Sequence, residues 1–68
     1  MSRSEQETTN EANRLTAQVE AALAAVAMHS PDGDELNSAA DRIERAARDL
    51  ATALRGLAHE RNATKDEQ

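Results

Sequence analysis

The chain lacks cysteine and aromatic residues altogether, and its 68 residues include only one proline and two glycines. Without cysteine it has neither disulfides nor thiolate ligands for a metal. Without aromatic side chains, which dominate most cores and binding hot spots, any core must be aliphatic. The scarcity of proline and glycine leaves long uninterrupted stretches, and the abundant alanine favours helices. We therefore predict an all-α protein.

The short length of the chain limits the core that it can build. A chain of 68 residues forms one small domain, and a core of that size gives little net stability without disulfides, a metal or association. The chain has no disulfide, and only two histidines could serve as nitrogen ligands. Association with other chains is the remaining route to stability, and we expect no cofactor and no metal site.

Acidic residues outnumber basic ones by 13 to 8, so the formal net charge is −5. This balance argues against non-specific binding to nucleic acids or to anionic membranes. Seven of the eight basic residues are arginine, which together with the many alanines is typical of a GC-rich bacterial genome. The polar first residues predict no signal peptide, and the most apolar run, residues 21–28, is too short to span a bilayer. We expect a cytoplasmic location.

Two amphipathic patterns are separated by a single break. Between them, residues 30–34 contain Pro-Asp-Gly, which is turn chemistry. So short a connection makes neighbouring helices antiparallel, and we predict an antiparallel helical hairpin over residues 8–61. We expect Thr8 to cap the first helix and either Ser30 or Asp34 to cap the second. The predicted parts are a disordered tail over 1–7, a helix over 8–29, a turn over 30–34, a helix over 35–61 and a disordered tail over 62–68.

The second helix carries the most regular pattern of the chain. Leu36, Ile43, Leu50 and Leu57 stand seven residues apart, and positions 40, 47 and 54 follow the first three after four residues. This spacing is typical of a helix that packs along another helix. Alanines at 39, 46, 53, 51 and 58 make the face wider than a two-stranded seam needs.

The first helix shows the same need for more than one neighbour. After Glu20, residues 21–28 are apolar on every side, which indicates burial on two sides. We therefore predict that the hairpin dimerises into a four-helix bundle. The predicted oligomer or partner interface comprises Leu15, Val19, Ala22, Leu23, Val26, Leu36, Ala40, Ile43, Ala47, Leu50, Leu54 and Leu57.

The outer face of the second helix carries four arginines that could contact a partner. They are Arg42, Arg45, Arg48 and Arg55. In its length and the position of its turn, the hairpin resembles the small RNA-binding helical-hairpin dimers of the Rop kind, which implies a nucleic-acid-binding regulator using this arginine face. Interleaved acids at Asp41, Glu44 and Asp49, and the absence of an aromatic side chain to stack on a base, favour a solvated salt-bridged face instead.

A second resemblance begins at residues 20–26, Glu-Ala-Ala-Leu-Ala-Ala-Val. With the Pro/Asp/Gly turn and the Arg/Ala/Leu-rich helix that follow, residues 14–57 resemble the paired dimerisation helices at the C-termini of actinobacterial modular polyketide synthases. This resemblance implies a docking or dimerisation module.

Catalytic patterns are missing from the sequence. No glycine-rich loop or nucleophile elbow surrounds its serine, histidine or acidic residues, and a chain this short has little room for a pocket. We predict a small non-enzymatic interaction protein, a regulator or adaptor that binds a second copy of itself and an unidentified partner protein. A nucleic-acid-binding regulator and a docking module stay open as alternatives.

Overall fold

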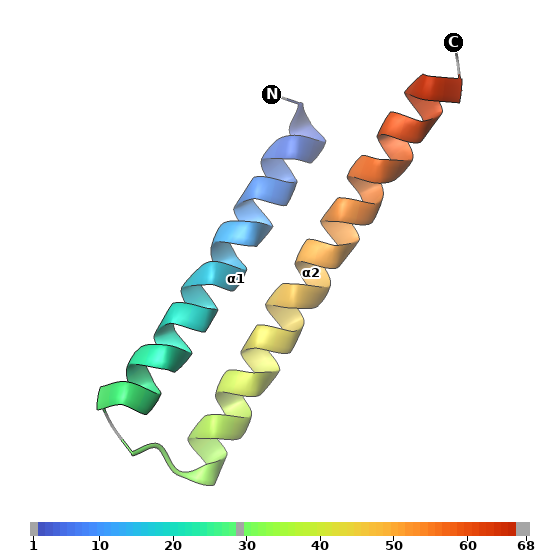
Figure 1. Ribbon diagram of the computed structural model, residues 1–68. Coiled ribbons are helices and arrows are strands. Elements are labelled where there is room, and N and C mark those ends of the chain that lie inside the picture. The colour runs from blue at the N-terminus through green and yellow to red at the C-terminus, as the bar shows by residue number, and fades with distance from the viewer. Residues whose placement is uncertain (1, 29, 67–68) are drawn as a thin grey trace.

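Two long helices make up the protein. The computed structural model describes residues 2–28 and 30–66, with side chains as far as residue 63. Helix α1 (Arg3–Met28) and helix α2 (Gly33–Asp66) contain 26 and 34 residues. They run antiparallel and side by side in a rod of 56 × 19 × 13 Å, and α2 extends past the start of α1 at the open end (Figure 1). The predicted all-α antiparallel hairpin is confirmed.

Helix α1 begins five residues before the predicted start at Thr8. The backbone N–H of Glu5 donates to Ser2 Oγ at 3.2 Å, so Ser2 caps the helix. Thr8 lies inside the helix, where its hydroxyl donates to the Ser4 carbonyl oxygen at 2.8 Å. Capping by Thr8 was therefore wrong. The Ser-x-x-Glu spacing of Ser2 and Glu5 is itself a capping-box pattern, and it lies upstream of the first apolar residue.

Helix α2 begins with Asp32 as its cap, so neither Ser30 nor Asp34 takes that role. The backbone N–H of Glu35 donates to Asp32 Oδ1 at 2.9 Å, and the N–H of Leu36 donates to the Asp32 carbonyl oxygen at 3.0 Å. Asp34 and Glu35 fall in the first turn, where negative charge is favourable next to the helix N-terminus. The helix therefore starts at Gly33, two residues before the predicted position 35.

Replacing Asp32 by alanine is expected to destabilise the hairpin by about 1 kcal/mol, because the N–H of Glu35 loses its hydrogen bond to the Asp32 side chain. Urea unfolding followed by circular dichroism measures this difference. The matched control is Asp34→Ala, which removes the same charge from the same turn without removing the cap. An equal loss in the two variants would contradict the assignment of Asp32 as cap.

Helix α2 also continues beyond the predicted end at residue 61. It passes through Gly56 and reaches Asp66, so residues 62–66 belong to the helix and not to a disordered tail. No glycine or proline follows Gly56 to stop the helix. Residues 1, 29, 67 and 68, which fall in the predicted tails and at the predicted end of the first helix, lie outside the described residues.

Replacing Gly56 by alanine is expected to stabilise the hairpin by about 0.5–1 kcal/mol. Gly56 is exposed in the middle of α2, and a Cβ placed there would meet no atom within 4 Å. The substitution therefore gains helix propensity without a clash. The reverse change at the exposed Ala58 should lower the free energy of unfolding by a similar amount. A destabilised Gly56→Ala variant would show that a neighbour occupies this position.

Candidate interaction surface

The seam is the line along which the two helices of one chain meet. On α2 one row of half-buried or buried residues recurs with alternating spacings of four and three, and the half-buried Ala47 and Ala51 lie beside it. Ala46 alone among the described residues is buried, with 7% of its surface exposed. Alanine at every second seam position lets the two backbones approach closely. The α2 seam residues are Ala39, Ile43, Ala46, Leu50, Ala53 and Leu57.

This seam differs in phase from the sequence pattern. The 4-3 ladder paired Ile43, Leu50 and Leu57 with positions 40, 47 and 54, whereas the seam pairs the same three residues with positions 39, 46 and 53. Ala40 is exposed, and Leu54 keeps 49% of its surface exposed. Half of the apolar stripe of α2 therefore lies outside the seam.

The α1 side of the seam has the same 4-3 spacing but is largely polar. Its half-buried residues are Ser4, Thr8, Glu11, Leu15, Gln18, Ala22 and Ala25. Two contacts set the register: Ser4 Oγ donates to Glu60 Oε2, and Thr8 Oγ1 lies 3.5 Å from the Ala53 carbonyl oxygen. The seam thus combines a row of α2 hydrophobic residues with a row of α1 residues that cover them poorly.

Glu11 is the least satisfied member of this row. Its Oε1 atom lies 3.5 Å from Arg14 Nη1, while its Oε2 atom is buried and has no hydrogen-bond partner among the described residues. The side chain shares a groove of about 270 Å³ with Glu7, Asp49 and Ala53. A buried carboxylate oxygen without a donor, near two further acids, opposes the packing of the two helices.

One side of the seam carries charge. A groove of about 220 Å³ is lined by Arg14 from α1 and by Arg42 and Asp49 from α2, and the groove beside Glu11 continues along the same side through Glu7. These residues flank the seam one position before a seam residue on each helix. We call this surface the charged side.

The opposite side of the seam is apolar. It is formed by the residues one position after a seam residue, with Leu23 at the edge, and Val19, Val26 and Leu23 keep 39%, 60% and 66% of their surfaces exposed. Several exposed apolar residues on the same side of both helices indicate a candidate interaction site. We call this surface the apolar face, and its members are Ala12, Val19, Leu23, Val26, Ala40, Ala47 and Leu54.

The predicted interface residues divide into two groups. Half of them are half-buried: Leu15, Ala22, Ile43, Ala47, Leu50 and Leu57. The other half are exposed: Val19, Leu23, Val26, Leu36, Ala40 and Leu54. All exposed members except Leu36 belong to the apolar face. Sequence reasoning missed the seam residues Ser4, Glu11 and Gln18, because polar residues carry no signal in a search for apolar periodicity.

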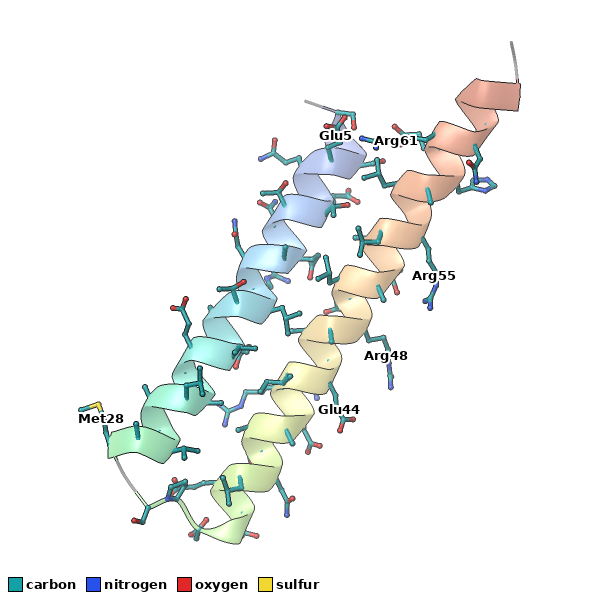
Figure 2. The ribbon with its side chains drawn as sticks, viewed as in Figure 1. Glu5, Met28, Glu44, Arg48, Arg55 and Arg61 are labelled. Carbon is teal, nitrogen blue, oxygen red and sulfur yellow. The ribbon has the colours of Figure 1, made fainter. Side chains whose placement is uncertain are left out.

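The turn end of the seam is loosely filled. A gap of about 350 Å³ lies between the helices there, lined by small residues such as Ala22, Ala25 and Ala39 and bordered by Leu36, which is 47% exposed. Met28 at the end of α1 points away from α2 and is 77% exposed (Figure 2). Helix α2 therefore does not cover all sides of the apolar residues 21–28 at the end of α1.

The four arginines of the predicted partner-contact face, Arg42, Arg45, Arg48 and Arg55, are all exposed. Arg48 and Arg55 point away from α1, as does Glu44 (Figure 2). The Nε atom of Arg42 donates to the Ser38 carbonyl oxygen at 3.3 Å. Ion pairs within 4.0 Å in the described part of the chain join Arg3 to Glu7 and Arg14 to Glu11. The predicted arginine face is thus exposed, without the salt bridges expected of it.

Among the described residues, the helices form neither a metal-binding cluster nor a membrane-spanning stretch. Across residues 2–28 and 30–66, no three histidine or acidic side chains gather closely enough to hold a metal ion. Over the same residues, neither helix has an apolar stretch long enough to cross a bilayer. No protein-family model, curated protein or solved structure matches the chain.

Proposed function

We propose that the protein is a small cytoplasmic, non-enzymatic interaction protein that dimerises through its apolar face and acts as a regulator or adaptor. In the dimer, two hairpins pack face to face into a four-helix bundle. The charges on the outside of the bundle are left to contact a partner protein. A single observation carries the proposal. The apolar stripes of both helices are rotated away from the seam, and toward the same side of the hairpin.

That direction follows from a comparison of each apolar stripe with its seam. On α1 the stripe includes Val19 where the seam includes Gln18, and on α2 the stripe includes Ala40 where the seam includes Ala39. The alternate positions, such as Leu15 on α1 and Ile43 on α2, belong to both the stripe and the seam. One residue turns 100° around a helix, so shifting every second position rotates the centre of the stripe by about 50°. In a square four-helix bundle, the bundle axis lies about 45° from the direction to a neighbouring helix. Both stripes therefore point where a bundle would have its core.

The exposed area supports the same conclusion. The chain exposes 5477 Å², whereas a compact monomer of this mass exposes about 4,200 Å². The excess of about 1,300 Å² exceeds the roughly 800 Å² that each partner buries in a standard protein interface. A second copy on the apolar face removes this excess, and it supplies the core that one chain, with Ala46 as its buried residue, does not build.

The proposed dimer leaves the arginine face free. Arg48 and Arg55 point away from α1, and Arg45 lines the groove on the charged side of the seam, opposite the apolar face. Arginine is favoured at protein interfaces because its planar guanidinium forms paired hydrogen bonds with carboxylates. We expect the partner to present an acidic surface to these side chains.

Sedimentation equilibrium over a range of concentrations tests dimerisation directly. The proposal predicts a dimer mass and a melting temperature that rises with concentration, because only association buries the apolar face. A folded monomer at all concentrations would overturn it. For the partner, an affinity pull-down from the source organism is compared with the same experiment on the variant carrying Arg45→Glu and Arg48→Glu. A specific partner is one that the wild type retains and the variant loses.

A nucleic-acid-binding regulator is the second candidate, and the exposed arginines without ion pairs favour it. Binding to RNA or DNA would be electrostatic, because no aromatic residue is present to stack on bases. A gel-shift assay at low salt separates this candidate from the adaptor. It predicts a shift that the double charge-reversal variant abolishes. Absence of binding at low salt would eliminate it.

A further inference from the structure

The two ends of the apolar face differ, and this difference selects one way of pairing two hairpins. The seam register places the residues of the face in levels. Glu5 follows the seam residue Ser4, and Arg61 follows Glu60, which accepts a hydrogen bond from Ser4. Glu5 and Arg61 therefore form the level at the open end, where both lie in Figure 2. Ala12 and Leu54 form the next level, followed by Val19 with Ala47. Val26 and Ala40 form the level nearest the turn. The face is therefore charged at one end and apolar along the rest of its length.

Two symmetric arrangements bring two such faces together. In the first, both turns lie at the same end of the bundle, and α1 packs against the partner's α2. In the second, the turns lie at opposite ends, and α1 packs against the partner's α1. Adjacent helices are antiparallel in both arrangements, so helix direction does not decide between them. The residues that face one another at each level decide between the two arrangements.

We infer that two copies of this chain pair through their apolar faces with both turns at the same end of the bundle. This inference rests on the proposed function, because it presupposes self-association, and it adds the orientation and the contacting helices. In this arrangement every level meets its own copy. Val19 of one chain faces the partner's Ala47, and Val26 faces the partner's Ala40, so a larger residue meets an alanine at each point.

Charge gives the second argument for this arrangement. With the turns together, Glu5 of each chain meets the partner's Arg61, and four charges of alternating sign close the open end. With the turns opposed, Glu5 would lie against the partner's Val26, and a half-buried carboxylate would lose water without gaining a cation. The apolar levels would then be broken at both ends of the bundle.

The acidic residues of the turn weakly oppose this arrangement. Asp32, Asp34 and Glu35 of both chains come to the same end of the proposed dimer, where they repel one another. All three are exposed, so salt screens their repulsion. Salt also screens the attraction between Glu5 and the partner's Arg61, so the two effects oppose each other and salt dependence does not separate the two arrangements.

Spin-label distances decide the orientation in the full-length protein. The chain has no cysteine, so Ser30→Cys labels the turn and Asn62→Cys labels the open end, and both residues are exposed. Double electron–electron resonance on the Ser30→Cys dimer should give a distance below about 30 Å, since neighbouring helix axes in a bundle are about 8–10 Å apart. A mixture of the two labelled variants should give an additional distance close to the 56 Å length of the hairpin.

The possible results are distinct. A long distance between Ser30 labels, with a short distance in the mixed sample, would overturn the orientation and leave self-association intact. A monomer mass without dipolar coupling between labels would overturn both the orientation and the proposed dimer. Sedimentation of each labelled variant, compared with the unlabelled wild type, shows whether the label itself disturbs association.

Discussion

Replacing Val19 and Leu54 together by glutamate is expected to dissociate the dimer and to remove most of its helical structure. The two residues lie at adjacent levels of the apolar face, on different helices, and are 39% and 49% exposed in the single hairpin. In the bundle, each substitution buries a carboxylate without a partner, which costs at least ~3 kcal/mol per charge. Association should weaken by at least about 1,000-fold.

A matched variant separates this effect from added charge. Ala24→Glu with Asn62→Glu introduces the same two charges at exposed positions on the same helices, outside the apolar face. We expect this control to keep the dimer mass and the concentration-dependent melting temperature of the wild type. If both double variants behave alike in sedimentation and circular dichroism, the apolar face is not the dimer interface. If the Val19 and Leu54 variant stays dimeric, the packing proposed here is wrong.

How far the sequence predicts this protein depends on which physical signal each feature leaves. The hairpin was predictable because Ile43, Leu50 and Leu57 repeat every seven residues and Pro31 interrupts the helices. The sequence did not predict that the seam includes positions 39, 46 and 53 in place of 40, 47 and 54. A wide apolar stripe contains several possible seams, and the position of the neighbouring helix selects one of them. Here the buried Ala46 lies in the seam, one position before Ala47 of the stripe, so the seam is shifted from the centre of the stripe.

The ends of the helices were misjudged for a related reason. The apolar periodicity begins only at Ala12 and therefore favoured Thr8 as the cap, although Ser2 and Glu5 already form a capping pair. Polar residues such as glutamate and glutamine propagate a helix nearly as well as leucine does. Residues 62–66 were assigned to a tail on the same grounds. Capping chemistry and the lack of a helix breaker were better guides than hydrophobicity.

The interaction surface illustrates the same division. The sequence identified Val19, Leu23 and Val26 as interface residues, and the structure leaves them exposed on one face. What sequence reasoning missed is the polar row of α1, above all Glu11. That row makes the isolated hairpin a poor fold, because its hydrophobic α2 residues meet polar partners. The weakness of the seam and the exposure of the apolar face both support the proposal that stability depends on a second copy.

Replacing Glu11 by leucine is accordingly expected to stabilise the protein by about 1–3 kcal/mol. The change removes a buried oxygen that has no donor among the described residues. It also removes the repulsion between Glu11 and the two acids Glu7 and Asp49, which line the same groove. The new side chain extends the α1 seam between Thr8 and Leu15 with an apolar residue. Thermal and urea unfolding should show the gain, and the melting temperature should depend less on concentration because the single hairpin is more stable.

Two further variants test whether the seam position of Glu11 is the cause. Glu7→Leu makes the same exchange one turn earlier, where the side chain is 62% exposed and pairs with Arg3 in solvent, and its effect should stay within about 0.5 kcal/mol. Glu11→Gln removes the charge but keeps a polar group in the seam, so it should stabilise the protein less than Glu11→Leu does. A Glu11→Leu variant no more stable than the wild type would mean that water already satisfies the carboxylate. The polar row would then not be what makes the hairpin depend on its partner.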